Sequence, residues 1–165
     1  MHQRFAVAFT GPSNSGKTTL ILKVATLLGD KYHKRVAIIK NDPKDKARFD
    51  VEGKDSYKFF QTGAEVIVTS PLRTTYFSHK HQELEELIGH FGAFDILLVE
   101  GLKTLPLPRI AIFRNRLDPD YYDACDAIAI DESIDASLIP AHLKSLDLND
   151  PQQVIEWILQ NAKKV

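Results

Sequence analysis

The sequence predicts an α/β fold, a three-layer sandwich in which helices flank a mostly parallel central sheet. Two observations predict it. Short apolar runs typical of buried strands alternate with helical stripes, and a cluster of turn-forming residues joins the first run to the first stripe. The chain has 165 residues, 44% of them apolar, which is enough to bury one core. We therefore expect a single domain over residues 1–165.

The fold begins with a strand, a loop and a helix. The apolar run Phe5–Phe9 predicts the strand, residues 10–16 the loop, and the stripe after Lys17 the helix, which Gly29 is suited to end. The stripe consists of Leu20, Ile21, Val24, Leu27 and Leu28. Residues 35–39 predict a second strand, parallel to the first because βαβ crossovers are almost always right-handed and parallel. The carboxyl ends of both strands should therefore meet at one edge of the sheet.

The remaining elements continue this alternation. Residues 40–53 are polar and without period, which predicts a long loop of the kind that is usually functional or mobile. Asp55 is expected to cap a short helix that ends near Thr62. Further strands are predicted over residues 65–69, 95–100, 110–113 and 127–130, the last of the sheet, and further helices over residues 84–91 and from Pro151.

Composition excludes several classes of protein. A single cysteine, Cys125, cannot form an internal disulfide, which fits a reducing compartment, so we expect a cytoplasmic protein. Lys and Arg number 21 against 22 Asp and Glu, and this balance argues against nucleic acid as a partner. No apolar run approaches the roughly 18 residues of a membrane span, so no membrane partner is expected.

Residues 11–18, Gly-Pro-Ser-Asn-Ser-Gly-Lys-Thr, match the phosphate-binding P-loop (Walker A) pattern G-x-x-x-x-G-K-[ST], between a strand and a helix as its mechanism requires. The glycines let backbone N–H groups turn toward phosphate oxygens, and the helix N-terminus adds positive potential. Lys17 is expected to contact the β and γ phosphates, and Thr18 to join a Mg²⁺ shell. The predicted nucleotide-binding residues of this loop are Gly11, Ser13, Asn14, Ser15, Gly16, Lys17, Thr18 and Thr19. The alternative is an ordinary glycine-containing turn with a solvated lysine.

Two acidic residues are candidate metal ligands. Glu100 ends the apolar run 96–99, so we expect it at the phosphate edge of the sheet, where it would orient Mg²⁺ or its water and share the catalytic role with Lys17. Asp42 lies near the tip of the second strand, in a segment that phosphate and Mg²⁺ could order. The alternatives are a solvated acid at the strand end and a solvated loop.

A second anion site is predicted at residues 53–56. Here Lys54, Asp55 and Ser56 stand at the start of the expected short helix. The alternative is an Asp cap with exposed neighbours.

Three further features carry weaker signals. His79 and His81 are interpreted as a surface pair rather than a metal site, because no third ligand is near in sequence. Cys125 is expected to be a buried small residue. Residues 115–118, Asn-Arg-Leu-Asp, are only loosely similar to a guanine-reading motif, since arginine replaces its lysine.

Together these segments resemble the MobB family, molybdopterin-guanine dinucleotide biosynthesis protein B. The resemblance is carried by residues 11–18, 36–40, 50–57, 63–64, 98–103 and 108–110. It implies a P-loop NTPase fold, GTP and Mg²⁺ as cofactors, and a homodimer that assists the guanylyltransferase MobA as it attaches GMP to molybdopterin. It also implies that Lys17 and Thr18 serve phosphate and Mg²⁺, that Glu100 is the strand-end acid, and that residues 54–56 bind an anion. Residues 41–45 depart from the family, which commonly has histidines there.

The sequence thus favours a GTP-binding adapter of molybdenum-cofactor synthesis that hydrolyses GTP slowly. Slow turnover is expected because no cis arginine or water-positioning glutamine can be assigned, although Arg48 or Arg73 could act across a dimer. The main alternative is a small-molecule kinase, for which residues 114–116 offer only a fragment of an arginine-rich lid. A nucleic-acid-dependent ATPase is disfavoured by the charge balance.

Overall fold

The computed structural model describes residues 3–165. The chain divides into two compact units, one formed by residues up to 41 together with 93–165 and the other by residues 42–92. We call them the sheet unit and the insert unit. The expectation of one domain over residues 1–165 stays a prediction.

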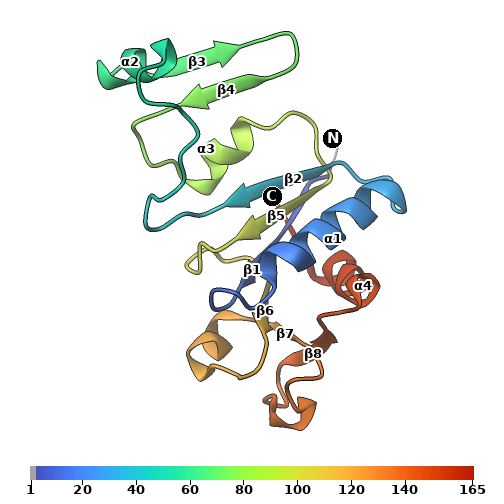
Figure 1. The fold of residues 1–165 in the computed structure, drawn as a ribbon. Helices are drawn as coiled ribbons and strands as arrows, with labels where there is room; N and C mark the ends of the chain where they lie inside the picture. The colour runs from blue at the N-terminus through green and yellow to red at the C-terminus, as the bar shows by residue number, and fades with distance from the viewer. Residues whose placement is uncertain (1–2) are drawn as a thin grey trace. The chain divides into compact units, whose positions relative to one another are not determined.

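The sheet unit is built on a seven-stranded sheet, six strands of which lie in the order β2-β5-β1-β6-β7-β8 (Figure 1). The seventh strand, β9, pairs antiparallel with the start of β1. All neighbours from β2 to β8 run parallel. The strands are β1 (Phe5–Thr10), β2 (Val36–Lys40), β5 (Ile96–Glu100), β6 (Arg109–Phe113), β7 (Ala127–Ile130), β8 (Lys144–Asp147) and β9 (Lys163–Lys164). The predicted α/β class with a mostly parallel sheet is confirmed.

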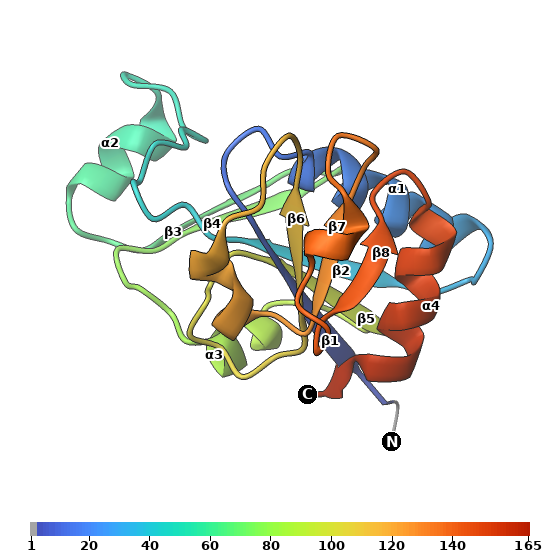
Figure 2. The ribbon, with the colours of Figure 1, turned by 90° about the horizontal axis from the view of Figure 1, so that it is seen from below.

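Helices α1 (Lys17–Asp30) and α4 (Pro151–Asn161) cover one face of this sheet (Figure 2). Successive residues of a strand point to opposite faces, so Ile110 and Ile112 pack in the core under these helices. Ala111 and Phe113 enter a second apolar cluster on the other side. That cluster includes Cys125 and residues around two short 3₁₀ helices, η1 (Pro119–Ala124) and η2 (Ala136–Leu138). The central strand β1 is consequently buried on both faces.

The insert unit contains two short helices, α2 (Asp55–Gln61) and α3 (Leu84–Gly89), and an antiparallel hairpin of β3 (Val66–Thr69) and β4 (Thr74–Phe77). The ring of Phe60 on α2 contacts Phe77 on β4 and stacks on His79. These ring contacts join the helix to the hairpin.

The strand expected over residues 65–69 is present as β3, which pairs with β4 in the separate hairpin. Two other predictions about these elements are wrong. Residues 127–130 are not the last strand, since two more strands of the sheet follow them. The helix α1 continues through Gly29 to Asp30, since Gly29 keeps a helical backbone and Lys31 makes the C-terminal cap.

Asp55 does not cap α2 either. It is the first helical residue, and Lys54 occupies the cap position without a side-chain cap bond.

Within residues 3–165, no helix has both the length and the apolar character that a membrane crossing demands.

Candidate nucleotide-binding site

The loop between β1 and α1 turns through backbone conformations that favour glycine. Gly11 has φ 139°, Asn14 φ 62° and Gly16 φ 97°. A Cβ atom at Gly11 would lie 2.4 Å from the carbonyl oxygen of Ile112, far inside van der Waals contact. The Leu20 N–H donates to the Gly16 carbonyl over 3.0 Å, so α1 starts directly from the loop. The first glycine is therefore required by the neighbouring strand as well as by the turn.

The Lys17 ammonium lies against the backbone of this loop. Its Nζ donates to the carbonyl oxygens of Gly11 at 2.9 Å and Pro12 at 2.6 Å. Burial lowers the pKa of Lys17 from its ordinary 10.5; the Glu100 carboxylate opposes the shift, while nearby Lys40 adds to it. A polyanion beside Lys17 would favour its charged form.

A cavity of about 510 Å³ opens over the start of α1. It is lined by Ser13, Asn14, Gly16, Lys17, Thr18, Thr19, Lys40, Glu100 and Arg114. In the sheet register Glu100 is the partner of Phe9 on one side and of Lys40 on the other, which places all three strand ends at one edge. The Glu100 side chain is 17% exposed and lies 3.9 Å from the Lys40 ammonium. The structure thus brings Lys17, Thr18 and Glu100 to one cavity, as the sequence predicted.

The cavity residues Lys17, Thr18 and Glu100 have the chemistry to bind a nucleotide phosphate chain and a hard cation. The Thr18 hydroxyl and the Glu100 carboxylate are oxygen donors on the same cavity, and Mg²⁺ in proteins is typically held by one or two carboxylates together with substrate phosphates and water. Ser15 is placed differently. Its buried Oγ has no hydrogen-bond partner within residues 3–165, and a Cβ at Gly11 would meet it at 3.2 Å.

A buried arginine shapes the segment that follows Glu100. Arg109 is 1% exposed, and its guanidinium donates to the carbonyl oxygens of Gly101 at 2.8 Å, Leu102 at 2.9 Å and Leu105 at 3.0 Å. The Gly101 N–H in turn donates to Phe9 over 2.9 Å. Sequence reasoning gave Arg109 no role, because a charged residue at a strand start is normally expected to be solvated.

The other predicted site residues belong to the insert unit. The Asp42 carboxylate accepts from the Lys46 and Ala47 N–H groups, at 2.7 Å and 2.6 Å, and so orders its own loop. Ser56 Oγ donates to Asp50 over 2.9 Å. Asp55 lies 3.7 Å from the Lys58 ammonium, and Lys54 is exposed. The ligand roles proposed for these residues stay predictions.

The weaker features have local structural partners. His79 stacks on Phe60 and makes a hydrogen bond to its carbonyl oxygen, and His81 lies 4.0 Å from Glu83. Asp118 accepts from the Asp120 N–H and caps η1. Cys125 is buried as expected, and burial raises the pKa of its thiol to about 11. Within residues 3–165 there is no group of three or more His, Cys, Asp or Glu that could hold a metal ion.

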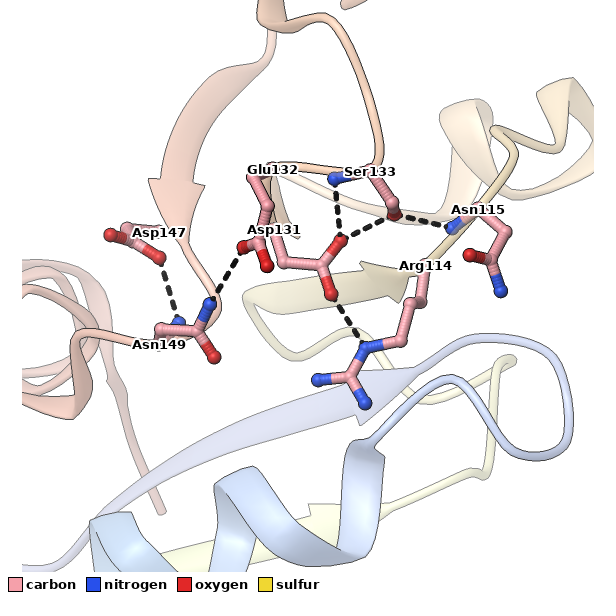
Figure 3. Close-up of polar contacts among 7 residues, drawn as sticks. All are labelled: Arg114, Asn115, Asp131, Glu132, Ser133, Asp147 and Asn149. Atoms are coloured by element: carbon pink, nitrogen blue, oxygen red, sulfur yellow. Dashed lines mark hydrogen bonds and ion pairs between the residues drawn. The ribbon is translucent and has the colours of Figure 1, made fainter.

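Arg114 is one of two cavity residues, with Lys40, that were not among the predicted site residues. It directly follows β6, and its Nε donates to the Asp131 carboxylate at the end of β7 over 2.7 Å (Figure 3). The available signal was its position, because residues that follow parallel strands gather at the ligand-binding edge of the sheet.

Comparison with known proteins identifies relatives over most of the chain. The family described as MobB, molybdopterin guanine dinucleotide synthesis protein B, matches residues 6–131. The molybdopterin-guanine dinucleotide biosynthesis adapter protein of Haemophilus influenzae is 32% identical over 162 residues, covering 92% of this chain and 86% of that protein. A putative adapter protein of the same name in Methanocaldococcus jannaschii is 27% identical over 132 residues, which span 76% of this chain and 54% of the relative.

Solved structures show the same fold. The crystal structure of Bacillus subtilis MobB has a TM-score of 0.73 at 24% identity, covering 96% of this chain and 98% of its own. The hydrogenase maturation factor HypB from Archaeoglobus fulgidus has a TM-score of 0.50 at 17% identity, covering 95% of this chain and 87% of that chain. At such identities the likeness establishes the fold alone.

Proposed function

Since the chain belongs to the MobB family, we propose that it is an adapter protein of molybdopterin-guanine dinucleotide biosynthesis that binds GTP with Mg²⁺ and hydrolyses it slowly. In this proposal it acts as a cytoplasmic homodimer. It assists a MobA-type guanylyltransferase as that enzyme attaches GMP to molybdopterin.

The observation that carries the nucleotide part is the shared cavity of the P-loop and Glu100. Backbone N–H groups at the start of α1 would bind phosphate oxygens, and the Lys17 ammonium would exchange its bonds to Gly11 and Pro12 for bonds to phosphate. Thr18 and Glu100 would hold the cation directly or through water. Bound Mg²⁺ would neutralise charge developing on the phosphates.

The residues of the insert unit have secondary roles in the proposal. Lys54 and Ser56, with Asp55, would bind a second anionic group, for which the phosphate of molybdopterin has the right chemistry. Asp42 is a further proposed ligand of the cation or its water. Its present bonds to Lys46 and Ala47 would have to open for that role.

Calorimetric titration with Mg²⁺ and GTP or ATP tests nucleotide binding. We expect tighter binding of GTP, and loss of binding in Lys17→Ala. The matched control is Lys23→Ala, which removes an exposed lysine from the same helix away from the cavity. Affinity that survives Lys17→Ala, or falls equally in Lys23→Ala, would show that the P-loop assignment is wrong.

The adapter role has its own assay. Added to a purified MobA-type enzyme, molybdopterin and GTP, the chain should raise the yield of guanylylated cofactor, and Lys17→Ala should not. An unchanged yield together with nucleotide binding would favour a small-molecule kinase, which phosphoryl transfer to candidate acceptors would then identify. Sedimentation equilibrium would test the homodimer, which a monomer at assay concentrations would contradict.

A further inference from the structure

Arg114 has the position of a ligand-binding residue rather than of a surface ion pair. It lines the same cavity as Lys17 and Glu100, and its Nη2 would be 3.6 Å from a Cβ atom added at Gly16. Its guanidinium is therefore beside the last glycine of the P-loop. Arginine binds phosphate oxygens well, because its planar N–H groups match their geometry.

Only one nitrogen of the Arg114 guanidinium, Nε, is bonded to another group within residues 3–165. Nε donates to Asp131 Oδ2 over 2.7 Å, and neither Nη group donates a hydrogen bond to these residues. The side chain is 42% exposed, so the remaining N–H groups are open to a ligand. A guanidinium that is held through Nε alone has a fixed direction, and its Nη groups can still donate hydrogen bonds to a ligand.

Asp131 is itself held in place by neighbouring groups. Its Oδ1 accepts from both the hydroxyl and the backbone N–H of Ser133. The Ser133 hydroxyl oxygen accepts from the Asn115 N–H over 2.7 Å, which joins the ends of β6 and β7 (Figure 3). The hydrogen bonds from Ser133, assisted by the Arg114 charge, hold the pKa of Asp131 below its ordinary 3.8. The carboxylate is thus ionised and oriented at neutral pH.

We propose that Arg114 binds the phosphate chain of the nucleotide through its Nη groups, and that Asp131, fixed by Ser133, is the positioning residue that aims it. This inference rests on the proposed nucleotide binding and adds a residue to it. It gives the cavity a further cation that a salt bridge holds in place, contributed by the residue after β6 rather than by the P-loop. The ligand class is a nucleoside di- or triphosphate.

The test uses three probes in calorimetric titration with Mg²⁺: the non-hydrolysable GTP analogue GMPPNP, GDP, and inorganic tripolyphosphate, which has no base or ribose. We expect Arg114→Ala to weaken all three by about 10- to 100-fold, the range of a hydrogen bond to a charged group. Arg114→Lys should recover only part of the lost affinity, because lysine keeps the charge but lacks the planar guanidinium with its paired N–H donors. The matched control is Arg116→Ala, which removes an exposed arginine two residues away that does not line the cavity and should change affinity less than about 2-fold.

Asp131→Asn separates positioning from mere structural support. It should weaken tripolyphosphate binding in the wild-type background and have no further effect in Arg114→Ala, because Asp131 acts through Arg114. Equal weakening in both backgrounds would overturn the positioning role. Wild-type affinity for tripolyphosphate in Arg114→Ala would overturn the whole inference. If the unaltered chain binds none of the probes, the proposed function falls with it.

Discussion

Substitution of Gly11 by alanine should destabilise the sheet unit more than any comparable glycine change. The new Cβ would lie 2.4 Å from the Ile112 carbonyl oxygen and 3.2 Å from its nitrogen. Both atoms belong to the backbone of a central strand, so no side-chain rotation can relieve the clash. Overpacking typically costs about 1–3 kcal/mol and a strained backbone conformation about 1–3 kcal/mol more, so we expect a loss of about 2–6 kcal/mol.

Two other glycines provide a graded comparison. Gly101→Ala combines φ 87° with a 3.1 Å approach to the Asn41 Cβ, a side-chain atom, and should cost less than Gly11→Ala. A Cβ atom added at Gly29 in α1 would meet no atom within 4 Å, so Gly29→Ala should be neutral or stabilising by about 0.5–1 kcal/mol.

Urea unfolding followed by the emission of Trp157 measures all three variants. Trp157 is the single tryptophan, and it lies on α4 with its side chain buried in the core between the helices and the sheet. An unfolding free energy for Gly11→Ala equal to or above that of Gly101→Ala would refute the steric reasoning.

Three further outcomes follow from buried or oriented polar groups. Arg109→Met should lower the free energy of unfolding by about 3–5 kcal/mol, because it leaves three carbonyl oxygens without a hydrogen-bond donor. Lys163→Ala, which removes an exposed donor to the Pro106 carbonyl, should cost less than about 0.5 kcal/mol. Similar losses in the two variants would contradict the role of Arg109. The pKa of the Cys125 thiol is raised from 9.0 to about 11, which predicts a thiolate fraction at pH 8 about 100-fold below that of the unfolded chain. Iodoacetamide should therefore label the native protein far more slowly than the urea-unfolded protein. Equal labelling rates would contradict the raised pKa. Because the pKa of Asp131 is lowered in the folded state, its stabilisation is present above pH 3.8 and disappears as pH falls through the lower folded value. The stability difference between wild type and Asp131→Asn should shrink in that acid range, and a constant difference would argue against the linkage.

The sequence predicted the parts of the fold whose signals are local. Residues close together in sequence predicted three of these parts correctly: the strand β1 from its apolar run, the loop from its glycine pattern, and the helix α1 from its apolar stripe. Glu100 was placed at the right edge because an apolar run of known length must carry it there. These features need no knowledge of which strands are neighbours.

The missed elements have weak or ambiguous local patterns. In the edge strand β8 only Leu146 is buried, so it has no apolar run to identify it. The strand β3 was predicted, but its pairing with β4 in a hairpin was not, and its apolar Ile67 and Val68 are exposed there. A strand pattern predicts extended backbone and does not choose its partner.

The missed site residues depend on pairing across the sheet. Arg114 and Asp131 are 17 positions apart in sequence, and only the parallel pairing of β6 with β7 brings them within 2.7 Å. Arg109 likewise reaches backbone carbonyls of an irregular segment that has no pattern in the sequence. Such contacts are properties of the topology.

The pairing of β9 with β1 has a practical consequence for handling the protein. The Val165 N–H donates to the Arg4 carbonyl over 2.9 Å, which fastens residues 163–165 beside the start of the central strand (Figure 2). The P-loop leaves the same strand at its other tip. A purification tag, surface anchor or fluorophore linked at Val165 would consequently emerge from the rim remote from Lys17 and leave nucleotide entry unhindered.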